Sequence, residues 1–197
     1  MLFRIVLLLA ALCVPLSMVA QQPVLQHAKE TAKAAAPASP LDPLVKKQFG
    51  PDFSVDPKFA PMYGDVDGDG TEDLVLVAMS KHPLGGSGAF HYTVSDPYDG
   101  YFGIGDPKIT TQFSTFGDGS GHCLVVIHDW KAATPKAKWV IVNVPFTKIA
   151  TGQMTLKKRT VTAITTEEED GLTSIVFFDG HKYKWQPNDF VDENAAR

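Results

Sequence analysis

The stretch Asp65-Val66-Asp67-Gly68-Asp69-Gly70-Thr71-Glu72-Asp73, followed directly by Leu74-Val75-Leu76-Val77-Ala78, places a dense acidic segment immediately before an apolar one. Carboxylates occupy alternate positions of this segment, with Thr71 taking one place in the series: Asp65, Asp67, Asp69 and Asp73. Two like charges about 5 Å apart repel by about 3 kcal/mol at an effective dielectric constant of about 20. An ordered loop of this composition therefore predicts a bound cation.

The loop offers only oxygen ligands, and Ca²⁺ binds six to eight oxygens in flexible geometry. We expect Ca²⁺ to be held by four carboxylates and one backbone carbonyl, that of Thr71, giving the ligand set Asp65, Asp67, Asp69, Thr71 and Asp73. Gly70 should make the sharp turn, and Glu72 should point outward. The motif is not an EF-hand, because its twelfth position is Leu76 where that motif requires Glu. The alternative is a solvated acidic turn before a strand.

The segment Gly64–Val77 resembles the calcium loop and following strand of FG-GAP/VCBS-type repeats, which occur in integrin-like β-propellers and many secreted bacterial proteins. The resemblance implies Ca²⁺-ligand roles for the same five residues. A propeller of this family repeats the motif at intervals of several tens of residues, whereas this chain carries one copy. The motif therefore indicates the metal more specifically than the overall fold.

The rest of the chain is typical of an all-β protein, because short runs rich in β-branched and aromatic residues alternate with Gly, Pro, Asp and Ser. We predict an antiparallel two-sheet sandwich or a propeller-blade-like assembly with one short N-terminal helix. That helix is expected at Pro43–Phe49, where Leu41, Val45 and Phe49 recur every four residues and Gly50 follows. Strands are expected at 73–79, 89–95, 108–115, 123–128, 138–145, 154–165, 174–178 and 182–186.

Two of these segments also predict their surroundings. Both faces of Trp139–Val144 are apolar, which indicates a strand covered on both sides. In Lys182-Tyr183-Lys184-Trp185 the alternation places the two aromatic rings in the core and the lysines in water. Asp179-Gly180 before this segment predicts a hairpin with a type I′ turn.

The N-terminus predicts export. Arg4 precedes the apolar run Ile5–Leu12 and a cleavage site after Ala20, as in a secretory signal peptide, and the run is too short to span a membrane comfortably. The expected organisation is a signal peptide at 1–20, an Ala/Pro-rich linker at 21–40, a calcium-binding β domain at 41–187 and a polar tail at 188–197. An uncleaved membrane anchor is the alternative. We predict a secreted or periplasmic protein with no membrane span after cleavage.

Composition and residue spacing argue against several classes of function. A net charge of −4 without a basic cluster argues against nucleic-acid binding. After cleavage Cys123 would be the sole thiol, expected as a buried hydrophobe. Neither Ser87 nor Ser120 has both of the flanking glycines of a nucleophile elbow, which argues against a serine hydrolase. No two histidines are three or four residues apart, as they would be in a zinc site on one helix.

We therefore predict a calcium-binding β module with a structural or binding role, whose partner is an envelope or extracellular protein or a glycan. Tyr98, Tyr101 and Phe102 could contact such a partner or instead fold inward over the core. The alternative function is a secreted hydrolase with a cleft containing His128, Asp129 or His122, supported by structural calcium.

Overall fold

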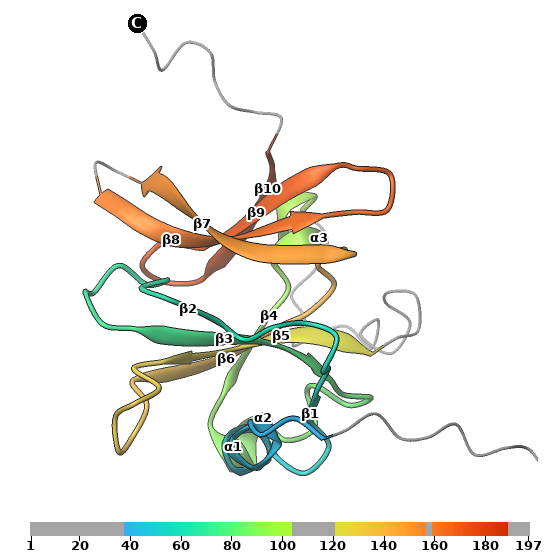
Figure 1. Cartoon of the computed structure of the whole chain (residues 1–197), viewed down its shortest axis with the longest axis vertical. Coiled ribbons are helices and arrows are strands. Elements are labelled where there is room, and N and C mark those ends of the chain that lie inside the picture. Colours follow the sequence, from blue (N-terminus) through green and yellow to red (C-terminus); the bar gives the residue numbers. More distant parts are fainter. Residues whose placement is uncertain (1–37, 104–120, 157–158, 189–197) are drawn as a thin grey trace, which may run out of the picture. The chain divides into compact units, whose positions relative to one another are not determined.

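The computed structural model describes residues 38–103, 121–156 and 159–188 of the chain (Figure 1). The predicted signal peptide, most of the predicted linker, the strand expected at 108–115 and residues 189–197 of the predicted tail lie outside the described residues. The helices are α1 (Asp42–Phe49), α2 (Ser87–Phe90) and α3 (Pro97–Tyr101). None of the helices in the described ranges is long and apolar enough to cross a membrane.

The strands form two sheets, as predicted for a sandwich. The first sheet contains β1 (Ser54–Val55), β2 (Met62–Gly64), β3 (Asp73–Met79), β4 (Thr93–Ser95), β5 (His122–His128) and β6 (Ala137–Ile141). The second contains β7 (Lys148–Leu156), β8 (Arg159–Glu167), β9 (Thr173–Phe178) and β10 (Tyr183–Pro187). Figure 1 shows the two sheets as separate layers, with α1 and α2 on the side of the first sheet away from the second.

Neighbouring strands are antiparallel except for β4 and β6, which run parallel. The first sheet has the order β1-β3-β5-β6-β4, with β2 also paired to β3, and the second has the order β10-β9-β8-β7. In the β3–β5 register Leu74 lies opposite Ile127. The beginning of β3 and the end of β5 are therefore neighbours, although more than fifty residues separate them in the sequence.

The first sheet is buried on both faces, which explains why β3 and β5 are apolar at nearly every position. Alternate residues of these strands, such as Leu76 and Val125, pack in a core with α1. The residues between them, such as Val75 and Val126, pack in a second core against β8, β9 and β10. The predicted inward positions of Tyr183 and Trp185 are confirmed, because both side chains lie in the second core.

Several sequence predictions of local structure hold. The N-terminal helix forms and buries Val45 and Phe49, Cys123 is buried with a free thiol, and Glu72 is exposed. β9 and β10 form the expected hairpin, but its turn is not type I′, because Gly180 has a positive φ of 100° and Asp179 does not. Instead the Asp179 carboxylate accepts hydrogen bonds from the backbone N–H groups of residues 181 and 182.

Three predicted strands were wrong in their extent. The expected strand 138–145 is extended only as far as Ile141, the end of β6, and Asn143 beyond it has a positive φ of 62°, which lies outside the β region. Residues 87–90 of the segment around the expected strand 89–95 form α2, and only Thr93–Ser95 is extended. Tertiary packing overrides the local pattern there, since the side chain of Phe90 packs against the core beside α1. The expected strand 154–165 is two strands, β7 and β8, which pair from Leu156 opposite Arg159. The two residues between these strands are lysines, so no Gly or Pro in the sequence predicts a turn there.

The acidic loop connects β2 to β3 and lies directly against the second sheet. The backbone N–H of Thr162 in β8 donates a 3.0 Å hydrogen bond to the carbonyl of Asp65. Gly64 allows this approach, because a Cβ at that position would lie 2.8 Å from Thr162 Cγ2. The loop that begins β3 therefore also holds β8.

Replacing Gly64 by Ala should destabilise the protein by about 1–3 kcal/mol, because the added methyl group overpacks the contact with Thr162. Chemical denaturation would measure the change. Gly88→Ala is the matched control, since nothing lies within 4 Å of its Cβ position. Equal unfolding free energies for the two variants would contradict the close approach of the loop to β8.

Candidate metal centre

The loop Asp65–Asp73 is folded around its own carboxylates. Both oxygens of Asp65 accept backbone hydrogen bonds, from Asp69 at 3.0 Å and from Gly70 at 2.9 Å. Asp67 Oδ1 also accepts from the Asp69 N–H, at 3.1 Å, and Asp69 Oδ1 accepts from the N–H and hydroxyl of Thr71. Gly70 has φ of +91°, which the turn requires. These bonds direct the carboxylates toward one another.

One carboxylate oxygen from each of Asp65, Asp67 and Asp69 lies within 4.8 Å of the other two. A lysine from another part of the chain adds a positive charge to this group. Lys136, in the loop between β5 and β6, places Nζ 2.7 Å from Asp67 Oδ2 and also contacts Asp69 Oδ2. Hydrogen bonding from Lys136 holds the pKa of Asp69 well below its usual value. Lys136 therefore neutralises part of the negative charge of the loop.

Asp73 is not part of this group of three carboxylates, and its own carboxylate accepts hydrogen bonds from three backbone N–H groups. Oδ2 accepts from Val66 at 2.9 Å and from Asp67 at 3.4 Å, and Oδ1 accepts from Asp129 at 2.9 Å. Burial raises the pKa of Asp73 to about 6. The side chain therefore fixes the start of β3 to the end of β5, and its predicted role as a metal ligand would come in addition to this one.

His128 connects the loop to the second sheet. Its ring is 2 % exposed; Nδ1 lies 3.2 Å from Asp67 Oδ2 and Nε2 lies 2.8 Å from the hydroxyl of Tyr183 in β10. Burial lowers the pKa of His128, which favours the neutral ring. A carboxylate cannot donate, so this arrangement favours a proton on Nδ1 and a hydrogen bond from the Tyr183 hydroxyl to Nε2. Asp67, Asp73 and His128 form a second group with ligand atoms within 4.8 Å.

The segment His128-Asp129-Trp130 includes two of the residues expected in a hydrolase cleft, but each of its residues contacts the acidic loop. His128 faces Asp67, the Asp129 N–H bonds Asp73, and Trp130 Nε1 donates to Glu72 Oε1 at 3.2 Å. Lys131 Nζ also pairs with Glu72, at 2.7 Å. The contribution of Lys136 had no local signal in the sequence, because it follows from the pairing of β3 with β5.

The side chains proposed for a hydrolase do not converge. His122 and His128 lie at opposite ends of β5, about 20 Å apart for six residues of extended chain. His122 Nε2 lies 2.8 Å from Asp56 Oδ2, whereas the ring of His128 is enclosed between Asp67 and Tyr183. The hollow lined by Ser54, Ser80, His82 and their neighbours contains neither His128 nor Asp129.

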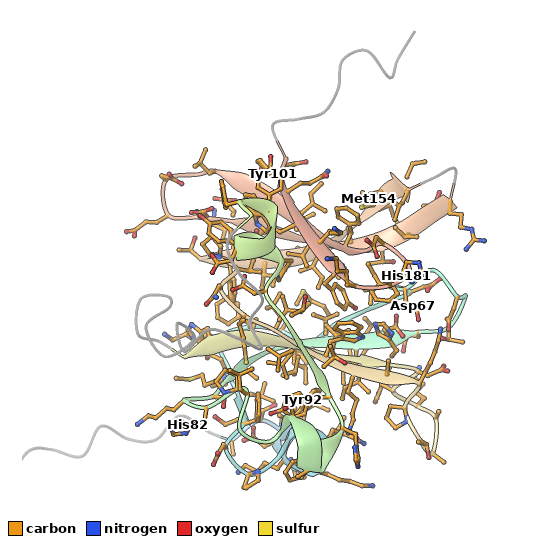
Figure 2. All side chains as sticks on the ribbon, turned by 180° about the vertical axis from the view of Figure 1, so that it is seen from behind. Asp67, His82, Tyr92, Tyr101, Met154 and His181 are labelled. Carbon is orange, nitrogen blue, oxygen red and sulfur yellow. The ribbon has the colours of Figure 1, made fainter. Side chains whose placement is uncertain are left out.

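The aromatic residues of 96–103 divide between a partly buried position and two exposed ones. Tyr98 packs against the core between the sheets, whereas Tyr101 and Phe102 are 46 % and 53 % exposed. All three rings contact Trp185. Figure 2 shows Tyr101 on α3 near the top of the view and Asp67 lower and to the right, so the exposed rings of α3 lie apart from the acidic loop.

The donor chemistry of the loop fits a hard divalent cation. Three converging carboxylates supply oxygen only, which matches Ca²⁺ better than metals that prefer nitrogen or sulfur. A single ammonium group balances part of their charge. Asp65, Asp67 and Asp69 are thus brought together, and the metal-ligand roles of these three residues, of Asp73 and of the Thr71 carbonyl all stay predictions.

Comparison of the chain with protein-family models, with curated proteins and with solved structures gave no match. The resemblance of Gly64–Val77 to FG-GAP/VCBS-type calcium loops therefore remains a prediction from the sequence.

Replacing Tyr183 by Phe should lower the unfolding free energy by about 1–3 kcal/mol, because the buried Nε2 of His128 loses its hydrogen-bond donor. Thermal denaturation would measure the loss. Tyr63→Phe is the control, because Tyr63 is 44 % exposed, and such surface changes stay within about 0.5 kcal/mol. A Tyr183 variant as stable as the control would argue against the contribution of this hydrogen bond.

Asp96, which caps α3 by accepting from the Asp99 N–H, should give a pH-dependent contribution to stability. Burial raises its pKa to about 6, above the value of about 3.9 for an unfolded chain. The folded state therefore keeps the proton longer, and this stabilisation is lost as pH rises from about 4 through 6. The stability of the wild type relative to Asp96→Asn should fall over that interval; a constant difference would contradict the shift.

Proposed function

We propose that this chain is an exported calcium-binding β module whose bound ion stabilises the fold and supports a structural or binding role. The ion would be held by Asp65, Asp67 and Asp69, with the Thr71 carbonyl and Asp73 completing the ligand set. When bound, Ca²⁺ would supply positive charge at the centre of the loop. The function proposed is not enzymatic.

One observation carries the proposal: the carboxylates of Asp65, Asp67 and Asp69 lie within 4.8 Å of one another, with their oxygens oriented by the backbone of the loop. Such a concentration of negative charge is unfavourable without a cation. Lys136 supplies one positive charge, and a divalent ion would balance the remainder better than a monovalent one.

The position of the loop explains why an ion bound there would stabilise the whole sandwich. Its residues contact β8 through the Asp65 carbonyl, β10 through Asp67 and His128, and the end of β5 through Asp73. Binding energy at such a site adds to folding stability. Free Ca²⁺ at about one hundred times Kd would contribute about 2.7 kcal/mol.

A binding role would use a different surface. Tyr101 and Phe102 expose their rings on and directly after α3, and aromatic rings give large contact area at small entropic cost. An envelope or extracellular protein, or a glycan, is the partner that these rings favour in an exported protein. Export itself rests on the signal-peptide pattern of residues 1–20.

A hydrolase function gains no comparable support. It requires His128, Asp129 or His122 in an open cleft, whereas His128 is buried and His122 lies at the other end of β5. His128 contacts both Tyr183 and Asp67, and these contacts favour a role in positioning the loop.

Isothermal titration with CaCl₂ tests the proposal. The wild-type protein should bind Ca²⁺, and Asp69→Asn should weaken binding by about tenfold or more, since affinity follows the charge of the ligands. Glu169→Gln is the matched control: it removes one negative charge from an exposed acidic loop elsewhere and should leave Kd unchanged. Absence of binding by the wild type at millimolar Ca²⁺ would overturn the proposal.

A further inference from the structure

Lys136 reaches the carboxylates from outside the acidic loop. Its backbone is fixed, since its N–H donates to the carbonyl of His128 at 3.1 Å. Its side chain is 47 % exposed, while Asp67 at the other end of the ion pair is 3 % exposed. The ammonium group can therefore leave for water without any rearrangement of the strand that follows.

The oxygens that Lys136 occupies are those the loop leaves available. Asp67 Oδ1 and Asp69 Oδ1 accept hydrogen bonds from the loop itself, and both oxygens of Asp65 do the same. Asp67 Oδ2 and Asp69 Oδ2 accept no backbone hydrogen bond among the contacts of the described residues, and both contact Lys136 Nζ. Asp67 Oδ2 also lies 3.2 Å from His128 Nδ1 on its buried side. A metal ion that used these two oxygens would need the position of the ammonium group.

We infer that Lys136 is a tethered competitor for the metal, and that it determines which cations the loop accepts. The inference rests on the proposed function and adds a specificity-determining residue to it. In the metal-free state the ammonium neutralises part of the loop; on metal binding its side chain swings into solvent while the backbone of the β5–β6 loop stays in place.

The competition acts against every cation, but it favours divalent over monovalent ions. A tethered group acts at a high effective concentration, typically millimolar for a short connection. A monovalent ion offers the same charge as the lysine and gains little by replacing it, whereas Ca²⁺ doubles the attraction to each carboxylate. Lys136 therefore lowers the affinity for every cation but excludes monovalent ions more effectively.

Calcium titration of the wild type, Lys136→Gln and Lys136→Arg at constant ionic strength tests this inference. Lys136→Gln should bind Ca²⁺ about fivefold to tenfold more tightly, in keeping with the loss of a paired ammonium group. Lys136→Arg keeps the charge and should remain close to wild type. Lys131→Gln is the matched control, because Lys131 pairs with the outward Glu72, and its Kd should not change.

Thermal unfolding separates competition from a purely structural role of Lys136. In chelator, Lys136→Gln should have a lower Tm than the wild type, because the carboxylates lose their counter-ion. Added Ca²⁺ should raise the Tm of this variant by more than it raises that of the wild type. A merely structural lysine would give the same Ca²⁺-induced rise in both proteins.

The outcomes distinguish this inference from the proposed function. Calcium binding by the wild type with no gain in Lys136→Gln, or with an equal gain in Lys136→Arg, would overturn the competition and leave the calcium site. Binding by Lys136→Gln alone would support the competition and overturn calcium binding by the natural chain. Failure of both proteins to bind millimolar Ca²⁺ would overturn both.

Discussion

The repulsion between carboxylates at the start of β3 is the constraint on which this end of the sandwich depends. Asp65, Asp67 and Asp69 converge to within 4.8 Å, and they do so next to the hydrogen bond that joins the loop to β8. Whatever neutralises these charges also holds the two sheets together there. Electrostatics and sheet packing are therefore linked at one place in the chain.

The polar contacts around the loop connect it to both sheets. Asp73 fixes the loop to the end of β5 within the first sheet, through backbone N–H groups. Asp67 connects it to the second sheet through His128 and Tyr183, all within a region otherwise filled by aromatic rings such as Phe178. Most buried polar groups in proteins have a hydrogen-bond partner, and in this series Asp67, His128 and Tyr183 serve as partners for one another.

This arrangement makes the loop suited to respond to ions. The lysine that balances it comes from a different connection of the first sheet, and its pairing oxygens are free of loop hydrogen bonds. A site with an internal cation can keep its carboxylates together without metal. Under the proposed function, calcium would then strengthen an existing contact between the sheets instead of creating the loop.

Alternation of apolar residues and charge density are local properties, so the amino-acid pattern alone predicted the all-β class, the positions of β3, β5, β9 and β10, and the cluster of Asp65, Asp67 and Asp69. The sequence did not predict the boundary between β7 and β8 or the helix α2, because no local turn or periodicity signal marks either of them. Only the tertiary structure brought Lys136, His128 and Tyr183 to the loop. These residues are distant along the chain, and the antiparallel pairing of β3 with β5, together with the packing of one sheet on the other, sets their proximity.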